Sequence, residues 1–403
     1  MAGPLDGIRV ADFTWVWAGP TNTMQLAHMG AEVIRMETSQ HICTLRMFPP
    51  WPDSKPGPNR SGYFNQYNQG KRAILLDLGK DEGAAIAKRI VEISDVAVEN
   101  FAAGVIDRLG FGYDELRKVN DDIIMMSMSG YGATGPDKDY VSYGPAQVPM
   151  SGLSSLTGYK DWQPMHVGMS YGDPTAGLHA AFAVIAALFY RERTGKGQYI
   201  DMSQWESSMV VIGEAFMQQV MNGAPPERDG SHDLHMAPHN VYRCAGEDRW
   251  IAISCASDEE FGALCGVIGK AELASDARFA TITERKANED ALDAEVEAWT
   301  SQQEPFEAME KLQAAGVAAY PPLVNQEVME SPHLAARDFW VEHEHPEVGV
   351  RRHAGIPWRF SETPLAVKRA APVMGQDNEY VFGELLGMGS DEIAGLVERE
   401  VIR

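Results

Sequence analysis

The sequence predicts an α/β protein that combines a large domain, built on an open parallel sheet, with a smaller α+β domain. Short apolar segments alternate with segments of helical pattern over the first part of the chain, and this alternation is typical of parallel sheets with crossover helices. A break that contains two prolines follows at 222–238, and beyond it the order of the elements changes. We therefore place the large domain at 1–215, a linker and the small domain at 216–335, and a return to the large domain at 336–403.

The beginning of the chain predicts a βαβ unit. Ile8 to Phe13 is a short apolar strand, and Gly19-Pro20 then breaks the chain, with the proline suited to the first turn of a helix. Gly30 ends that helix, and Glu32 to Met36 returns as a strand. Ligands of such sheets bind beyond the carboxyl ends of the strands. The segment from Thr14 to Gly19 is therefore predicted to border a binding site.

Further elements continue the pattern. The apolar stretch Ala176 to Tyr190 carries His179 and is shorter than the ~20 residues that span a bilayer, so we predict a buried core helix. Residues 40–62 are rich in Pro, Arg and Trp and predict a long loop near the active site. The remaining predicted strands are 73–78, 95–98, 123–128, 249–255 and 317–320, and the remaining helices are 81–93, 113–119, 258–268, 291–299, 305–315 and 391–397.

Charge and cysteine content narrow the classes of function. The chain has 34 basic and 57 acidic residues, a net charge of −23, so it lacks the basic surface that binding to nucleic acid or an anionic membrane requires. A small anionic ligand held by a few local cations remains compatible with this charge. The four cysteines form no Cys-x-x-Cys pair, which favours a reducing, cytoplasmic setting. Met1 to Leu5 shows no basic region before an apolar run, so no signal peptide is expected.

The most informative short motif is Gly172-Asp173-Pro174, which opens the long apolar helix. Asp is a favoured N-cap residue and Pro a favoured first helical residue, so the motif could be purely structural. The two interpretations are compatible, however, because a helix N-terminus favours a negative charge and should keep Asp173 ionised. An ionised carboxylate beside small residues is a usable nucleophile.

A glycine-rich segment, Gly130 to Gly135, follows a predicted strand and matches the Gly-x-Gly-x-x-Gly pattern. A dinucleotide site would require a helix that begins within the pattern, but Pro136-Asp137-Lys138-Asp139 follows instead. We therefore predict a loop that borders a ligand pocket, and no NAD cofactor.

Three histidines lie close together after the break, at His232, His235 and His239, with Asp233 between them. Their spacings could place metal ligands on one helical face. Gly230 and Pro238 indicate a loop instead, and no cysteine or glutamate completes a set. We predict a polar loop and no metal.

Short segments in a fixed order over nearly the whole chain carry a resemblance to a known family. They are Leu5 to Val10, Gly30 to Glu37, Gly70 to Arg72 before the strand that ends at Leu78, Glu99 to Phe101, Gly130 to Gly132 with Thr134 to Pro136, Gly172 to Pro174, Arg193 to Gln198, and Ala315 to Val317. In this order and spacing they resemble the family III CoA-transferases, the group that includes formyl-CoA transferase and carnitine CoA-transferase.

The resemblance implies a Rossmann-like large domain, a smaller domain and two interlocked chains, so the partner would be a second copy or a related subunit. It implies that Asp173 is catalytic and that the ligands are an acyl-CoA and a carboxylic acid, without a metal. Cations among the implied contacts would bind the CoA phosphates through charge-assisted hydrogen bonds. The implied CoA contacts are Val16, Ala18, Lys71, Arg72, Asn100, Phe101, Val105, Arg108 and Lys138.

The implied mechanism is covalent. Asp173 attacks the donor thioester and forms a mixed anhydride, and the CoA thiolate then gives an aspartyl-CoA thioester that the acceptor acid consumes in reverse. Two segments depart from the family pattern: Thr38 to Cys43 replaces a Pro-Gly-Asp stretch, and Asp229 to His232 replaces a glycine-rich lid.

Trp15 and Trp17 stand in the first loop, where formyl-CoA transferase carries smaller polar groups. Two indoles predict a bulky or aromatic acyl group, although one of them could serve only packing. The segment Trp15 to Pro20 resembles that of succinyl-CoA:(R)-benzylsuccinate CoA-transferase subunits, which implies succinyl-CoA as a donor. We assign Trp15, Trp17 and Tyr143 to the substrate.

Two alternatives remain open. An α-methylacyl-CoA racemase would carry a histidine about thirty residues before the aspartate, where this chain has Tyr143-Gly144-Pro145. A non-catalytic CoA-binding subunit of a heteromer would be expected to lack the nucleophile, whereas Asp173 is present.

Overall fold

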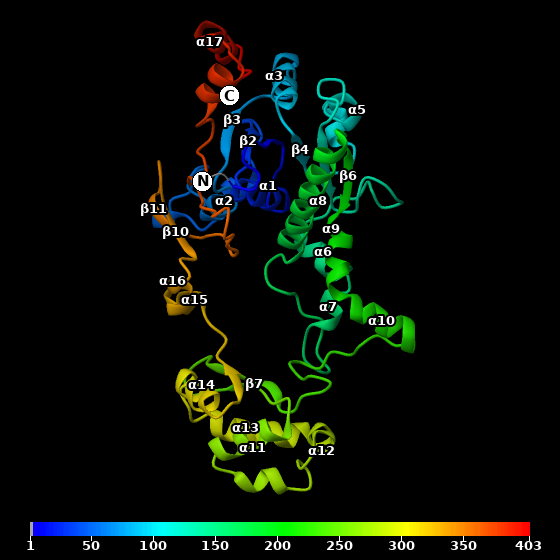
Figure 1. The fold of residues 1–403 in the computed structure, drawn as a ribbon, viewed down its shortest axis with the longest axis vertical. Coiled ribbons are helices and arrows are strands. Elements are labelled where there is room, and N and C mark those ends of the chain that lie inside the picture. Colours follow the sequence, from blue (N-terminus) through cyan, green and yellow to red (C-terminus); the bar gives the residue numbers. More distant parts are fainter. Residues whose placement is uncertain (1–2) are drawn as a thin grey trace. The chain divides into compact units, whose positions relative to one another are not determined.

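The computed structural model describes residues 3–403 and contains a six-stranded parallel sheet (Figure 1). This result confirms the predicted α/β fold. The sequence analysis missed β6, whose alternating burial marks an edge strand with one face in solvent. In spatial order the strands are β3 (Arg72–Leu75), β2 (Glu32–Glu37), β1 (Arg9–Asp12), β4 (Val96–Glu99), β5 (Ile124–Ser129) and β6 (Tyr199–Ser203).

The strand order reverses between β1 and β4, which are parallel neighbours. From β1 the chain continues to β2 and β3 on one side of this point, and from β4 it continues to β5 and β6 on the other side. A crevice consequently opens at the carboxyl ends of β1 and β4, where open α/β sheets bind their ligands. The segment after β1 begins at Phe13 and the segment after β4 at Asn100.

Both faces of the sheet are buried, as is typical of parallel sheets. Successive strand residues serve opposite faces, so that Ala11 packs on the side of α3 (Asp81–Glu92) and Val10 on the side of α1 (Ala18–His28) and α8 (Gly172–Thr194). The other helices of this part are α2 (Gly62–Tyr67), α4 (Val105–Arg108), α5 (Tyr113–Leu116), α6 (Gly144–Met150), α7 (Leu153–Leu156), α9 (Gln204–Met209) and α10 (Gly213–Asn222), with 3-10 turns at Thr44–Met47, Pro52–Ser54 and Val210–Ile212.

Helix α8 was predicted as a buried core helix, and the structure buries it on one side only. Ala176 and Ala180 face the core beside α1, whereas Phe182 and Phe189 are 74% and 61% exposed. Within residues 3–403 it is also the one helix long and apolar enough to cross a membrane. Core helices of soluble proteins pass the same test, and the packing of α8 against α1 and β5 is that of a core helix.

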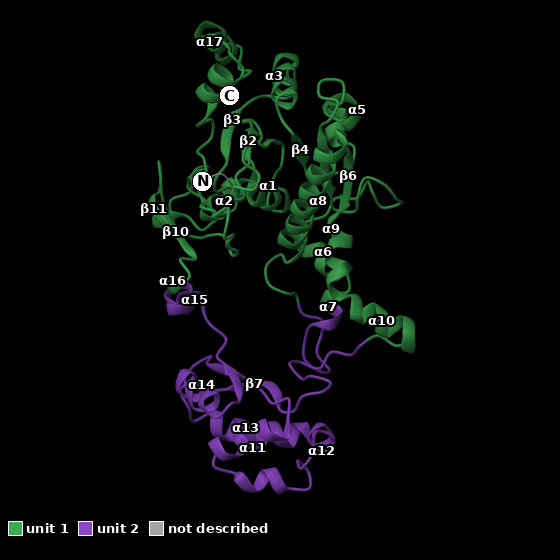
Figure 2. Ribbon diagram, in the orientation of Figure 1, with its two compact units in different colours: residues 1–154, 166–225, 335–403 green, residues 155–165, 226–334 purple. Residues whose placement is uncertain are grey.

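The chain divides into two compact units (Figure 2). Unit 1 holds the parallel sheet and comprises 1–154, 166–225 and 335–403; unit 2 comprises 155–165 and 226–334. Unit 2 has an antiparallel sheet with helices around a separate apolar core. Its elements are β7 (His239–Arg243), β8 (Trp250–Ser254), β9 (Ala318–Tyr320), α11 (Asp258–Val267), a 3-10 turn (Ala271–Ser275), α12 (Ile282–Ala287), α13 (Glu289–Thr300), α14 (Pro305–Ala314) and α15 (Asn325–Glu330).

The last segment of the chain belongs to unit 1. After α16 (Pro332–Ala336) it forms a hairpin of β10 (Trp340–His345) and β11 (Gly349–Ala354), then a π-helix (Glu379–Leu385) and α17 (Ser390–Glu398). The hairpin is joined to α2 by hydrogen bonds between Gln66 and Ala354. Phe382, Leu396 and Val401 enter the core on the α3 side of the sheet.

Candidate active site

A cavity of about 190 Å³ lies in unit 1 at the reversal point of the sheet. Three segments supply most of its wall: the loop after β1, the loop after β4, and the segment that leads into α6. The cavity thus lies where the topology predicts a ligand site. Its lining residues are Trp15, Val16, Asn100, Phe101, Ala102, Gly130, Tyr140, Val141, Ser142, Tyr143, Asp173 and Gln204.

Asp173 is the carboxylate in this wall, and it is only 8% exposed. The helix α8 begins at Gly172 with Tyr171 as its N-cap residue, so Asp173 is not the N-cap that its motif suggested but lies inside the first turn. The carboxylate accepts hydrogen bonds from the main-chain N–H groups of Ala18 and Gly144 and from the Ser170 hydroxyl.

Three helix N-termini converge on this carboxylate. Ala18 is the first residue of α1, Gly144 is the first residue of α6, and Asp173 itself lies at the beginning of α8. The N–H groups of a first helical turn have no partners within the helix, and the helix dipole favours an anion beside them. Gly177 allows α8 to approach α1, because a Cβ atom there would lie 2.7 Å from the Ala18 carbonyl oxygen.

Two opposed effects set the pKa of Asp173. Burial raises the pKa above its ordinary value, because the charged form loses its hydration. The hydrogen bonds from Ser170, Gly144 and Ala18 lower it, but they do not cancel the effect of burial. Burial thus opposes the helix N-terminus and the hydrogen bonds, which favour the ionised form of Asp173. The result is a carboxylate more basic than one in water, which strengthens it as a nucleophile once ionised.

Glycine is required at position 144. A Cβ atom there would overlap both the Ser170 hydroxyl and the Asp173 carboxylate. The helix α6 begins at this residue after an extended Tyr143, and Pro145 occupies its first turn, where proline is favoured. The Gly144 N–H group can therefore approach Asp173 without a side chain in the way.

Aromatic side chains form much of the cavity wall. The rings of Trp15 and Phe101 lie 6.3 Å apart, and Tyr140 and Tyr143 are more than half exposed beside them. Trp17 does not line this cavity. It is 9% exposed and packs against Tyr63 and Tyr67, with ring centroids 5.1 Å apart in both pairs.

Lys71 and Arg72, two of the cations expected to bind CoA, are engaged elsewhere. The Lys71 ammonium has no exposed surface: it donates to the Pro20 carbonyl and the Asn68 side chain and lies 3.4 Å from Asp12. Burial also lowers the pKa of Lys71 to about 8. In this structure the ammonium therefore has no access to a phosphate.

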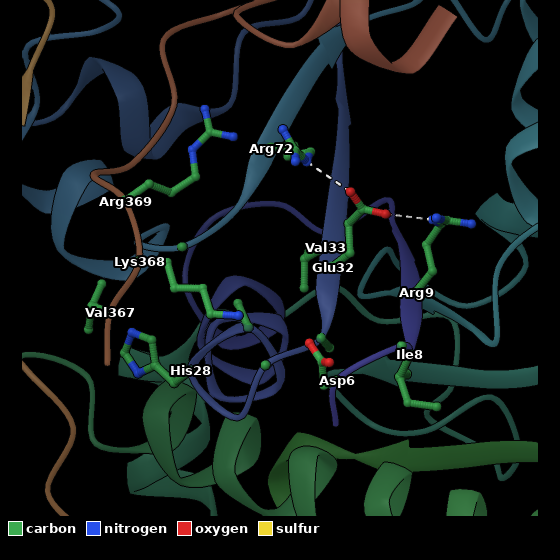
Figure 3. A pocket seen from close by; sticks show the side chains of 15 residues that line it. Asp6, Ile8, Arg9, His28, Glu32, Val33, Arg72, Val367, Lys368 and Arg369 are labelled. Atoms are coloured by element: carbon green, nitrogen blue, oxygen red, sulfur yellow. Dashed lines mark hydrogen bonds and ion pairs between the residues drawn. The ribbon is translucent and has the colours of Figure 1, made fainter. Parts of the chain in front are cut away.

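Arg72 lines a different cavity, of about 340 Å³, at the beginnings of β1, β2 and β3 (Figure 3). There Glu32 accepts hydrogen bonds from both Arg9 and Arg72. Arg72 also donates to Asp377 and stacks on the Tyr380 ring. This network ties the final segment of the chain to the amino edge of the sheet.

The other expected CoA contacts lie on segments that leave the carboxyl edge of the sheet. Asn100 and Phe101 follow β4 directly and line the cavity, and Val16 lines it from the loop after β1. Val105 and the exposed Arg108 form α4 shortly after β4. The exposed Lys138 lies on the glycine-rich loop after β5.

In unit 2, His232 belongs to a group that could hold a metal ion with Asp229 and Glu289, because the three potential ligand atoms lie within 4.8 Å of one another. The other ring nitrogen of His232 lies 2.9 Å from Asp293, and these acids raise its pKa. His235 and His239 are not part of this group. Sequence spacing could not indicate the group, because Glu289 comes from α13, more than fifty residues away.

Sequence reasoning assigned no role to Ser170, Gly144 or Tyr140. Ser170 precedes Asp173 by three residues at a helix start, a spacing at which side chains commonly meet, so this contact was readable in principle. Gly144 and Tyr140 reach the site only through the path of the chain between β5 and α8.

Comparison with known proteins identifies the family. The model of "CoA-transferase family III" matches residues 5–378. The chain is 39% identical over 342 residues, 84% of this chain and 86% of the relative, to the acetyl-CoA:oxalate CoA-transferase of Acetobacter aceti. It is 32% identical to the succinyl-CoA–D-citramalate CoA-transferase of Chloroflexus aurantiacus, over 99% and 98% of the two chains.

Among solved structures, a CaiB/BaiF family protein from Brucella suis has a TM-score of 0.88 at 31% identity, covering 96% of this chain and 100% of that one. The fold and the sequence thus lead to the same group of enzymes, which act on CoA thioesters and carboxylic acids. The chain therefore belongs to CoA-transferase family III and is an enzyme that passes CoA from an acyl-CoA to an acid.

Proposed function

We propose that Asp173 is the covalent nucleophile of this transfer and that the acceptor acid is bulky or aromatic. The observation that carries the first part is the placement of Asp173. Its carboxylate lies in the wall of the cavity, is nearly buried, and is held by three hydrogen-bond donors. A carboxylate fixed in this way is positioned for attack without further ordering.

The reaction proceeds by acyl exchange at Asp173. A carboxylate oxygen attacks the thioester carbonyl of the donor, the C–S bond breaks, and a mixed anhydride and CoA thiolate form. The thiolate then attacks Cγ of Asp173, which releases the donor acid and leaves an aspartyl-CoA thioester. The acceptor carboxylate attacks this thioester and forms a new anhydride, and the returning thiolate yields acceptor-CoA and free Asp173.

The main-chain N–H groups of Ala18 and Gly144 serve as oxyanion donors in the steps at Cγ. Both groups hydrogen-bond the carboxylate and lower its pKa, and one carboxylate oxygen carries the negative charge of each tetrahedral intermediate at Cγ. Donors fixed before the reaction stabilise this charge without reorganisation. Gly144 is essential to the arrangement, since a side chain at that position would occupy the place of the carboxylate.

The cavity wall supports an apolar acyl group. Trp15, Phe101, Tyr140, Val141 and Tyr143 line it, and no Lys or Arg is among its lining residues. A dicarboxylate would place its second charge there without a cation, which is unfavourable in an apolar surrounding. As donor we propose succinyl-CoA, which three related transferases carry in their names.

A small dicarboxylate is the second candidate acceptor, because relatives are named for oxalate, citramalate and glutarate. Turnover of a panel of acids, from oxalate, succinate and glutarate to phenylacetate and benzylsuccinate, with succinyl-CoA as donor will decide. We expect the highest kcat/KM with an aromatic acid. A clear preference for oxalate or glutarate would contradict the aromatic assignment.

We also propose that the enzyme works as a dimer of two copies or with a related subunit. Large apolar side chains are exposed along α8 and α10 in the isolated chain, among them Phe182, Phe189, Val220 and Met221. Large exposed apolar side chains of this kind are often covered by another protein.

Trapping of the intermediate tests the role of Asp173. The protein is incubated with an acyl-CoA, quenched with hydroxylamine and analysed by mass spectrometry, which should locate a hydroxamate on Asp173. The isosteric Asp173→Asn should abolish both adduct and transfer while CoA binding is retained. Asp139→Asn is the control, because this exposed carboxylate follows the glycine-rich loop and does not line the cavity. An adduct on another residue, or turnover by Asp173→Asn, would refute the mechanism.

A further inference from the structure

We propose that Asn100 is a positioning residue for the nucleophile, which it holds in place through the loop between β1 and α1, rather than primarily a contact for CoA. This inference rests on the proposed role of Asp173. It adds a mechanical requirement to that role: the Ala18 N–H group can reach the carboxylate only while the loop is held in an unfavourable conformation.

The side chain of Asn100 closes two hydrogen bonds with one residue of the loop. The Trp15 N–H group donates to Oδ1 of Asn100 at 2.7 Å, and Nδ2 of Asn100 donates to the Trp15 carbonyl at 2.9 Å. Both polar groups of the Trp15 main chain are thereby bound by one carboxamide. Asn100 directly follows β4, so the contact bridges the two strands between which the sheet order reverses.

The residue that follows is strained. Val16 has a φ angle of +57°, which is unfavourable for a β-branched side chain. Strain of this kind persists only where the surroundings impose it. The paired hydrogen bonds on Trp15 impose it from one side. On the other side the Val16 N–H group lies 3.3 Å from the Cys43 sulfur, which is a weak acceptor.

The strained turn directs the chain into α1. Two residues after Val16, the helix begins at Ala18, whose N–H group donates to Asp173. The next residue, Gly19, lies so close to the Asn100 side chain that a Cβ atom there would be 2.8 Å from Cγ of Asn100. Asn100 therefore supports the loop at Trp15 and also touches the first turn of α1.

The beginning of the loop is anchored separately, which isolates the contribution of Asn100. Asp12 accepts hydrogen bonds from the Thr14 N–H and hydroxyl groups and from the Thr23 hydroxyl. Those contacts fix Thr14 and the body of α1. Between these fixed points, Trp15 and Val16 are held by Asn100 and by the weak contact with Cys43.

Kinetics of Asn100→Ala separate a positioning role from a ligand role. Without the carboxamide, Val16 relaxes to a negative φ angle and the Ala18 N–H group turns away from Asp173. A displacement of about 1 Å at a reacting group costs roughly 10²-fold in rate. We expect kcat to fall by about that factor, with the Kd for CoA, measured by titration calorimetry, changed by less than about threefold. A Kd weakened tenfold or more with an unchanged kcat would overturn the proposal.

A second substitution tests the strain directly. Glycine adopts positive φ angles without penalty. The turn should therefore persist in Val16→Gly even without the hydrogen bonds from Asn100. The loss of kcat caused by Asn100→Ala should therefore be much smaller in the Val16→Gly background than in the natural sequence. Equal losses in both backgrounds would show that Asn100 does not act through this turn.

Two controls complete the design. Asn120 also bridges main-chain carbonyl groups, those of Val91 and Ser94, but it lies before β5, away from the cavity. Asn120→Ala should lower stability and leave kcat within about twofold, which shows that loss of an Asn bridge is not sufficient. Trapping of the adduct in the natural sequence is done in parallel. If no adduct forms on Asp173, the proposed nucleophile fails; if it forms and Asn100→Ala does not slow its formation, only the present inference fails.

Discussion

At the scale of single residues, Ser170 supplies a side-chain hydroxyl to the Asp173 carboxylate, beside the two main-chain donors. The main-chain N–H groups are fixed by the helices that they begin. The hydroxyl can be removed by substitution. It is therefore the means by which the ionisation of Asp173 can be adjusted without a change in the backbone.

Ser170→Ala should shift the acidic limb of the rate profile to higher pH. Asp173 attacks as the carboxylate, so the rate falls when the pH drops below its pKa. Burial raises this pKa and the Ser170 hydrogen bond lowers it, so loss of the hydroxyl raises it further. Measurement of kcat/KM from pH 4 to 8 checks this. Ser151→Ala is the control, because Ser151 is similarly buried and its hydroxyl bonds to main-chain groups of Val148 and Leu153, not to Asp173. An unchanged limb in Ser170→Ala would refute the assignment.

At the scale of elements, the loop at 40–62 is fastened by a buried ion pair. Nε and Nη2 of Arg46 donate to Glu37 at the end of β2, at 2.9 and 2.6 Å, and neither side chain is appreciably exposed. The guanidinium also stacks on Phe64 at 3.6 Å. Arg46 and Arg35 hold the pKa of Glu37 near 2 against the opposing effect of burial. This anchorage positions Cys43 against Val16.

Arg46→Met should therefore destabilise the protein strongly. The substitution keeps the volume but removes one partner of a buried pair, which costs about 3–5 kcal/mol because the other charge remains buried. Urea unfolding followed by far-UV circular dichroism measures the loss. Arg399→Met is the matched control, since Arg399 and Glu82 form an exposed pair and should contribute far less. Comparable losses in both variants would contradict the interpretation.

Buried histidines in and beside the β10–β11 hairpin should make the protein less stable in acid. Burial lowers the pKa of His343, His345 and His353 in the hairpin, and it lowers that of the neighbouring His28 in α1 to about 4. The unfolded chain binds these protons near pH 6.5, whereas the folded chain does not. Stability is therefore complete above pH 6.5 and is lost as the pH falls from 6.5 towards 4.

His28→Gln should reduce this acid sensitivity. At pH 5 the natural histidine should cost about 2 kcal/mol relative to neutral pH. The fall in Tm between pH 7.5 and 5 should thus be smaller in the variant. His41→Gln, at an exposed position, should not change the fall, and an unchanged fall in His28→Gln would refute the prediction.

At the scale of the whole molecule, the sequence predicted the fold well and the site in part. The open parallel sheet follows from the local alternation of strands and helices, and the Asp173 motif lies where a helix begins. Lys71 shows the limit: the family resemblance implied a CoA contact there, but Asp12 at the end of β1 holds it in the interior. Local sequence does not report which distant carboxylate faces a lysine. Local sequence likewise does not show which side of α8 stays exposed, because this depends on which distant segments pack against the helix.

The exposed apolar side chains of α8 and α10 lead to the prediction of a dimer. Light scattering coupled to gel filtration should give twice the chain mass of 44.3 kDa. Charged residues at exposed, apolar contact positions disrupt association, so Phe182→Glu combined with Val220→Glu should shift the protein towards monomer. Glu392→Lys is the control, because Glu392 lies on α17 and not on α8 or α10. A natural protein that is monomeric and fully active would contradict the dimer.

The path of the chain through unit 1 also bears on biosynthesis. The sheet is complete once β6 has emerged from the ribosome, but the core on its α3 side is incomplete until Phe382, Leu396 and Val401 have been made. Unit 2, which is translated in between, is therefore finished before the domain that precedes it. The nascent enzyme must keep this incomplete core from aggregating while almost half of its sequence is still being synthesised, so it should depend on chaperones more than its final stability suggests.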